Sequence, residues 1–182
     1  MTGAVFTIGH STRSIDEFVG ILRPAGVALV VDVRTVPRSR TNPQYNEDSL
    51  GENLAPWQIG YRRIAELGGL RGKSREVPAE LNALWRNQSF HNYADHALSE
   101  AFDAGLEELL QVSAERPTAI MCSEALWWRC HRRIIADYLL LRGREVMHLM
   151  GNGRASPAAI TPGAKEKDGR LVYPAPAIRD GA

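Results

Sequence analysis

The stretch "VALVVDVR", Val27–Arg34, determines which fold class the sequence predicts. It is almost continuously apolar and rich in valine, and two charged residues, Asp32 and Arg34, stand at its end. Strands that helices cover on both faces have this composition, whereas strands with one solvated face alternate apolar and polar residues. We therefore expect a buried parallel strand with Asp32 and Arg34 at its carboxyl end.

The residues before this stretch complete a strand–helix–strand unit. "AVFTIGH", residues 4–10, reads as a short buried strand, and residues 14–26 place apolar side chains at helical spacing. Ser14 followed three residues later by Glu17 forms a capping box, which predicts the start of the helix. This arrangement is typical of the α/β class.

The remaining sequence continues the alternation of helices and strands. Residues 35–49 contain two prolines and many polar residues, which predict a loop. This loop is long for a connection in a compact domain, and such long loops are often functional. Further elements are expected as a weak helix over 46–57, a short strand near 59–63, helices over 78–116, a strand from 118, a helix over 128–141 and a strand over 144–150. The fold predicted is a single α/β domain, residues 1–150, with a mainly parallel open sheet and helices on both faces. Residues 151–182 are rich in glycine, proline and alanine, and we expect a tail that packs on the surface or is partly mobile.

The composition excludes several classes of protein. Of the 182 residues, 44% are hydrophobic and 24% are charged, as in ordinary soluble domains. No apolar run approaches the ~20 residues that span a bilayer, and the amino terminus lacks the pattern of a signal peptide. Two cysteines provide no disulfide framework, so we expect a cytoplasmic protein without membrane contact, either a monomer or a homodimer.

The local charge points to an anionic partner. Residues 34–75 hold eight Lys/Arg and four Asp/Glu, and residues 126–154 hold six and two, so each zone carries +4. Both zones contain the unusual motifs of the chain. Positive surfaces of this kind attract anionic small molecules or nucleic-acid backbones, although arginines that balance acidic helices would give the same count.

Polar residues follow four of the expected strands. Open parallel sheets bind ligands outside the carboxyl ends of their strands. We therefore expect one crevice that gathers His10 and Ser11, Asp32 and Arg34, Cys122 and Glu124, and His148.

The order of the motifs "TIGHSTRS", "VDVRTVPRSRTNPQYN", "AELGG", "MCSEALWWRCHR" and "VMHL" resembles that of the DUF488 family of bacterial and archaeal proteins. The resemblance covers residues 7–149. It implies a small mixed α/β protein of unknown function. The motif positions that it carries over are His10, Ser11, Asp32, Arg34, Pro37, Arg38, Ser39, Cys122, Glu124, Cys130, His131 and Arg132.

The two cysteines support more than one reading. A cysteine near a helix start and beside arginines has a lowered pKa, which would suit a nucleophile at Cys130 or Cys122. The same residues would also serve as small apolar groups of a core. Cys130 and the adjacent His131 would point about 100° apart on a helix, and the C-x7-C-H spacing differs from that of zinc sites. We therefore expect neither a metal nor another cofactor.

Glu124 and the loop after the second strand offer other chemistry. Arginines 129, 132 and 133 stand near enough in sequence to predict an ion pair with Glu124. The arginines, hydroxyls and aromatic ring of residues 34–45 suit a phosphodiester and an unstacked base. Cys122 and Arg129 loosely resemble the phosphate loops of cysteine phosphatases and rhodaneses, but with one extra residue.

Three hypotheses remain from the sequence. The leading one is an enzyme of hydrolase type that acts on a nucleotide or nucleic acid, including hydrolysis at a glycosidic bond, with arginines holding phosphate. The alternatives are a nucleotide- or nucleic-acid-binding module without chemistry, and a cysteine-dependent enzyme of rhodanese or phosphatase type. The candidate catalytic residues are Asp32, Glu124, His10, His131 and Cys122. The candidate substrate- and anion-binding residues are Ser11, Arg34, Arg38, Ser39, Arg40, Tyr45, Cys130 and Arg132.

Overall fold

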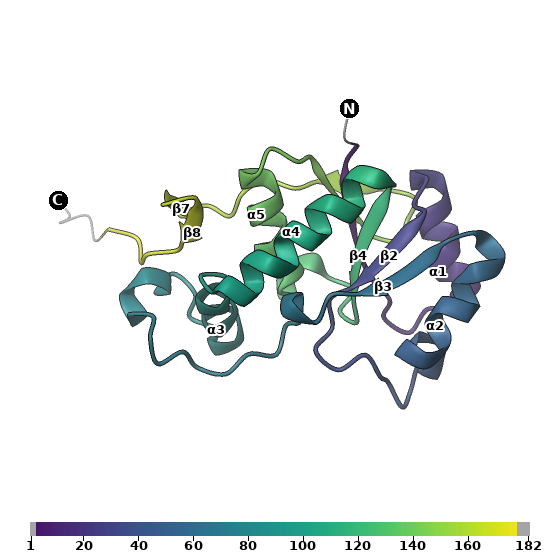
Figure 1. The fold of residues 1–182 in the computed structure, drawn as a ribbon, viewed down its shortest axis with the longest axis horizontal. Coiled ribbons are helices and arrows are strands. Elements are labelled where there is room, and N and C mark those ends of the chain that lie inside the picture. The colour runs from purple at the N-terminus through teal and green to yellow at the C-terminus, as the bar shows by residue number, and fades with distance from the viewer. Residues whose placement is uncertain (1–2, 178–182) are drawn as a thin grey trace.

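A computed structural model describes residues 3–177, which form one α/β domain (Figure 1). Its main sheet has six strands in the order β3-β2-β4-β1-β5-β6. The first five are mutually parallel, and β6 pairs with β5 in the antiparallel direction. The predicted fold class, a mainly parallel open sheet with helices on both faces, is confirmed.

The strands of the main sheet are β1 (Val5–Gly9), β2 (Leu29–Asp32), β3 (Gly60–Arg63), β4 (Thr118–Cys122), β5 (Val146–Leu149) and β6 (Ala155–Pro157). A separate hairpin consists of β7 (Lys165–Lys167) and β8 (Arg170–Val172). The α-helices are α1 (Ile15–Leu22), α2 (Glu47–Leu54), α3 (Gln88–His96), α4 (Glu100–Glu115) and α5 (Arg132–Leu141). Short 3₁₀ helices cover Arg23–Ala25, Pro43–Tyr45, Ala55–Trp57, Ala65–Leu67, Ala79–Asn82 and Trp127–Arg129.

The strand β2, between β3 and β4, is buried on both faces, as its valine-rich sequence predicts. Leu29 and Val31 belong to the larger hydrophobic core, which also contains residues of α3, α4 and α5. Val30 points to the opposite face, where a smaller core contains residues of α1 and α2. Successive side chains of a strand alternate between faces, so one short apolar run supports both layers (Figure 1).

The start of α1 follows its sequence signal. The Ser14 side chain accepts a hydrogen bond from the Glu17 backbone N–H, and the Glu17 carboxylate accepts one from the Ser14 N–H. Both bonds satisfy N–H groups that the first helical turn leaves unpaired. The capping box is therefore confirmed.

The start of α5 differs from the prediction. We expected a helix from residue 128, but α5 begins at Arg132, and Cys130 before it has extended backbone angles of φ −129° and ψ 150°. The residues Trp127–Arg129 form a separate 3₁₀ turn. Cys130 therefore lies just outside the helix and is free to face the end of β4.

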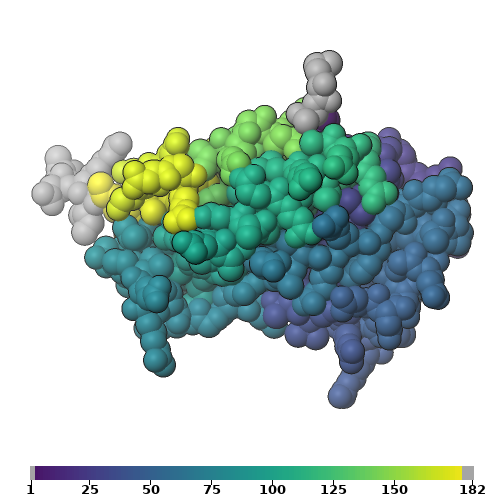
Figure 2. Space-filling model, in the orientation of Figure 1, coloured from purple at the N-terminus to yellow at the C-terminus, as the bar shows by residue number. Residues whose placement is uncertain are grey.

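Residues 151–177 pack on the domain. The strand β6 extends the main sheet, and Tyr173 after β8 is fully buried. The backbone of Tyr173 also exchanges hydrogen bonds with the backbone of residues 81 and 84. Figure 2 shows this C-terminal segment, in yellow, lying against the teal residues around α3. Residues 178–182 of the expected tail lie outside the described residues.

Among residues 3–177, no helix combines the length and the apolar character needed to cross a membrane.

Candidate functional site

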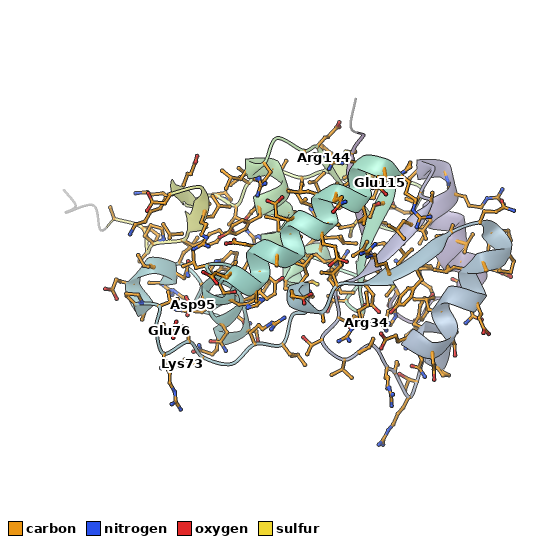
Figure 3. The ribbon with its side chains drawn as sticks, in the orientation of Figure 1. Arg34, Lys73, Glu76, Asp95, Glu115 and Arg144 are labelled. Carbon is orange, nitrogen blue, oxygen red and sulfur yellow. The ribbon has the colours of Figure 1, made fainter. Side chains whose placement is uncertain are left out.

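A cavity of about 730 Å³ opens at the carboxyl ends of β1, β2 and β4. Figure 3 shows Arg34 at this end of the sheet, whereas Arg144, which precedes β5, lies at the opposite end. The residues that we predicted for the site and that line the cavity are His10, Ser11, Arg34, Arg38, Ser39, Cys122, Glu124, Cys130 and His131. The remaining predicted residues, Asp32, Arg40, Tyr45 and Arg132, are not among its lining.

The two cysteines form a pair on the wall of this cavity. Cys122 ends β4, Cys130 lies just before α5, and their sulfur atoms are 2.8 Å apart. Both side chains are buried, and both are free cysteines. At this separation, one sulfur donates its proton in a hydrogen bond and the other accepts it.

Arg132 supplies the positive charge at this pair. Its guanidinium Nε lies 3.0 Å from the Cys122 sulfur and 3.5 Å from the Cys130 sulfur. The other guanidinium nitrogens donate to the Thr7 hydroxyl at 3.2 Å and to the Glu124 backbone carbonyl at 2.5 Å. The side chain is fully buried, yet no carboxylate of residues 3–177 forms an ion pair with it. Of the groups in contact with this buried cation, only the two sulfurs are able to carry a negative charge.

His131 is oriented toward the sulfur of Cys130. Its Nε2 lies 2.7 Å from the backbone carbonyl oxygen of Val33, and its Nδ1 lies 3.4 Å from the Cys130 sulfur. A carbonyl oxygen only accepts hydrogen bonds, so Nε2 carries a proton and Nδ1 is available to exchange one with Cys130. The expected divergence of the two side chains is wrong, because Cys130 lies before the helix. Within the described residues there is nevertheless no group of three acidic, histidine or cysteine side chains able to hold a metal.

The surroundings separate the two thiols electrostatically. Burial raises the pKa of Cys122 well above its ordinary value, and the hydrogen bond to Cys130 adds to this effect. Burial alone would also raise the pKa of Cys130. However, the hydrogen bond from Cys122 and the positive charges of His131 and Arg132 outweigh it, so the pKa of Cys130 lies well below its ordinary value. The arrangement therefore favours a thiol at Cys122 and a thiolate at Cys130.

Asp32 lies below the cavity and holds Arg34. Its carboxylate accepts hydrogen bonds from Arg34 Nε at 2.9 Å and from a terminal guanidinium nitrogen at 2.7 Å. The hydroxyl of Tyr61 donates to the same carboxylate at 2.5 Å. Asp32 is completely buried, so these bonds leave it positioning an arginine of the cavity and not facing a ligand.

His10 connects Arg34 to the backbone of Ser11. Arg34 NH1 donates to His10 Nε2 at 3.3 Å, and His10 Nδ1 donates to the Ser11 carbonyl at 2.8 Å. The ring of Tyr45 stacks on the His10 ring at 4.2 Å, so Tyr45 supports the histidine from the core. Burial lowers the pKa of His10 to about 4, and the charge of Arg34 contributes. His10 is therefore neutral at physiological pH.

Glu124 lies at the cavity's rim. Its side-chain Oε1 accepts a hydrogen bond from the Leu126 backbone N–H at 3.0 Å, and the residue is exposed. The predicted ion pair with Arg129, Arg132 or Arg133 is wrong, because Arg132 bonds to the backbone of Glu124 and not to its carboxylate. Among the residues that line the cavity, Glu124 is the one with a carboxylate side chain.

The outer wall combines cations with apolar side chains. Arg38 and Arg129 line the cavity, are exposed, and form no ion pair with any carboxylate of residues 3–177. Val36 and Leu70 line it with 57% and 69% of their surfaces exposed. Such a wall suits a ligand with both a negative group and an apolar part. Ser39 also structures this loop, since its hydroxyl accepts a hydrogen bond from the Asn42 N–H.

His148, which we expected in the same crevice, does not line the cavity. Its Nδ1 lies 2.7 Å from the Thr7 hydroxyl, and the Trp127 ring stacks on it at 4.2 Å. Burial, aided by the charge of Arg132, lowers the pKa of His148 to about 4. His148 therefore supports Thr7, which in turn contacts Arg132.

Sequence reasoning missed the role of the two glycines in "AELGG". A side chain at Gly69 would overlap the His131 ring, with Cε1 only 2.7 Å from the added carbon, and one at Gly68 would press on Thr35. The glycines let the loop after β3 approach the site closely. A glycine pair before a basic loop was the available signal, but nothing in the sequence reveals that His131 is its neighbour.

Comparison with known proteins gives a family without an assigned activity. A family model described as "Domain of unknown function DUF488" matches residues 14–139, more than half of the chain. No curated protein and no solved structure matches the chain. The matched residues include Arg34, Cys122, Cys130, His131 and Arg132, so most of the site lies within the family's domain. The chain belongs to the DUF488 family.

Proposed function

We propose that the protein is a cysteine-dependent enzyme in which the Cys130 thiolate attacks an electrophilic centre of an anionic substrate. The observation that carries this proposal is the buried guanidinium of Arg132, which touches both sulfurs and has no carboxylate partner among residues 3–177. An unpaired buried charge is costly, so a neighbouring anion stabilises the fold. A thiolate at the cysteine pair supplies that anion.

The neighbours of Cys130 divide the work of activating it. His131 Nδ1, at 3.4 Å, accepts the thiol proton. The backbone N–H of Arg132, in the first turn of α5, lies 3.5 Å from the same sulfur and adds the positive end of the helix dipole. Cys122, whose environment favours the protonated form, donates a hydrogen bond to the thiolate. The thiolate is the reactive form of cysteine.

The cavity favours an anionic substrate of intermediate size. Arg38 and Arg129 are available to bind a carboxylate or phosphate, and Val36 and Leu70 offer an apolar wall. A volume of about 730 Å³ accommodates a molecule as large as a nucleotide. We place this chemistry in the reducing cytoplasm, where free thiols persist.

A hydrolase acting on a nucleotide or on nucleic acid is the second candidate. It is favoured by one observation: the Glu124 carboxylate shares the cavity with Arg38 and Arg129. In this scheme Glu124 activates water, because Asp32 is engaged with Arg34 and Tyr61. We rank it second, because it gives no role to the cysteine pair or to Arg132.

Labelling with iodoacetamide, followed by peptide mass spectrometry, tests the leading proposal. We expect stoichiometric modification of Cys130 near pH 7, faster than that of a free model thiol at the same pH, and no fast modification in a Cys130→Ser variant. The Cys122→Ser variant should retain modification at Cys130. Slow labelling of both cysteines in the folded protein would reject the thiol mechanism. Loss of nucleotide turnover in Glu124→Gln, with Cys130→Ser fully active, would instead establish the hydrolase.

A further inference from the structure

We propose that Cys122 and Cys130 carry out thiol–disulfide exchange with anionic low-molecular-weight disulfides, ending in a reversible disulfide between the two cysteines. This inference rests on the proposed function, because it begins with attack by Cys130. It adds the substrate class and a second chemical role, that of Cys122 as the resolving thiol.

The geometry of the pair favours closure of the disulfide. The sulfurs are 2.8 Å apart, so less than about 1 Å of movement brings them to the ~2.05 Å of a disulfide bond. Cys122 ends a strand at the centre of the sheet, and Cys130 directly precedes α5. The loop between them contains the 3₁₀ turn Trp127–Arg129, so both ends of the pair are held by ordered backbone.

The reaction has two exchange steps. The Cys130 thiolate attacks one sulfur of the disulfide R–S–S–R, which breaks that bond, forms a Cys130–S–S–R bond and releases R–S⁻. Cys122 then loses its proton to the departing R–S⁻ and attacks the Cys130 sulfur, which expels a second R–S⁻. The net reaction converts one dithiol and one disulfide into the Cys122–Cys130 disulfide and two R–SH equivalents, one of them ionised. Thiols of the same class reverse both steps and restore the dithiol.

Arg132 determines in which direction the exchange is favoured. In the dithiol form its guanidinium lies beside a thiolate, whereas the disulfide form leaves this buried cation without an anion. Stabilising the reduced form of a cysteine pair makes its disulfide a stronger oxidant. We therefore expect the disulfide form to be easily reduced and to be less stable than the dithiol form. A disulfide crosslink usually raises the stability of a folded protein, so this expectation is the opposite of the common case.

The outer wall selects the charge of the substrate. Arg38 and Arg129 line the same cavity as the cysteine pair and have no carboxylate partner among residues 3–177. Their charge attracts disulfides that carry carboxylates and repels cationic ones. Glu124 shares the cavity, but its carboxylate accepts the Leu126 N–H.

The test exposes the reduced 182-residue chain to three probes: glutathione disulfide, which is anionic, the neutral 2-hydroxyethyl disulfide and the cationic cystamine. Mass spectrometry after acid quenching follows the products. We expect the wild type to lose two hydrogens as the Cys122–Cys130 bond closes, and the Cys122→Ser variant to accumulate a mixed disulfide at Cys130. Cys122→Ala is the second variant, in case the serine does not fold.

Charge selectivity and stability are measured on the same material. In the Arg38→Gln/Arg129→Gln double variant, the ratio of the rate with glutathione disulfide to the rate with the neutral probe should fall at least about ten-fold. The oxidised wild type should melt at a lower temperature than the reduced wild type.

Each possible outcome has one interpretation. Rapid iodoacetamide labelling of Cys130 without any Cys122–Cys130 disulfide would overturn this inference and leave the proposed function standing. Absence of both reactions would overturn both. Equal rates with cystamine and glutathione disulfide would reject the anionic substrate class. An oxidised form that melts higher than the reduced form would reject the role given to Arg132.

Discussion

Replacing Arg132 by methionine removes the cation beside the cysteine pair while keeping a long side chain in the same space. The Arg132 Nε lies 3.5 Å from the Cys130 sulfur. At an effective dielectric constant of about 20, opposite unit charges at this distance attract by roughly 5 kcal/mol. We therefore expect the pKa of Cys130 to rise in Arg132→Met, because the thiolate loses this attraction.

The assay is the pH dependence of iodoacetamide labelling at Cys130. Its midpoint reports the pKa, whereas the plateau also depends on the intrinsic nucleophilicity of the thiolate. Other charged or titratable groups at the pair are Cys122 and His131, and neither is changed by the substitution. Removing one partner of a buried charge pair is costly, but the Cys130 thiolate left behind becomes neutral by taking up a proton, so the variant should fold.

Arg133→Met is the matched control. Arg133 is the next residue of α5, but its guanidinium contacts the Thr161 hydroxyl and the Trp85 ring instead of the sulfurs. The labelling midpoint of Arg133→Met should move by less than about 0.5 pH units, because Arg133 contacts neither cysteine sulfur. A folded Arg132→Met protein whose midpoint equals that of Arg133→Met would show that the Arg132 charge does not stabilise the Cys130 thiolate.

Three further substitutions test other parts of the structure. Gly69→Ala should displace the His131 ring, slow the labelling of Cys130 and lower the free energy of unfolding by about 1–3 kcal/mol. Gly72→Ala is the control and should behave as the wild type, because there is open space around Gly72. Equal labelling rates in the two variants would contradict the contact between residue 69 and His131. Asp32→Asn should lower the free energy of unfolding by about 3–5 kcal/mol, because it leaves the buried Arg34 without a carboxylate partner. Urea titrations measure this change, and an unfolding midpoint equal to that of the wild type would argue against the ion pair. The folded-state pKa of His148 is about 4, so the unfolded chain protonates at this histidine before the folded chain does as the pH falls from 6.5. The free energy of unfolding should therefore fall by about 3 kcal/mol by pH 4. A His148→Asn variant whose stability has the same pH dependence as the wild type would disprove this effect.

The fold was predictable because its signals are local. The valine-rich run of β2 and the capping box of Ser14 and Glu17 need only neighbouring residues to act. The rule that parallel strands present their carboxyl ends at one edge then predicts that His10, Arg34 and Cys122 gather, as they do. The start of α5 was harder to predict, since the turn at Trp127–Arg129 and the extended Cys130 depend on packing against β4.

The function of each side chain in the site was less predictable than its position. Glu124 and Arg132 are close in sequence, yet Arg132 reaches the Glu124 backbone and the two sulfurs. Asp32 stood at a strand end in the sequence, but its carboxylate is directed to Arg34 and Tyr61 below the cavity. These outcomes depend on side-chain directions between distant segments, which hydrophobic periodicity and residue spacing do not encode.

The ionisation of Cys130 is tested most directly by counting the protonated thiols of the folded, reduced protein. The S–H stretching band in the infrared spectrum at pH 7 measures them without modifying the protein, and the Cys122→Ser and Cys130→Ser variants assign each contribution. We predict one S–H group for the two cysteines of the chain, at Cys122, with Cys130 ionised beside Arg132. Two S–H groups in the folded wild type would contradict it.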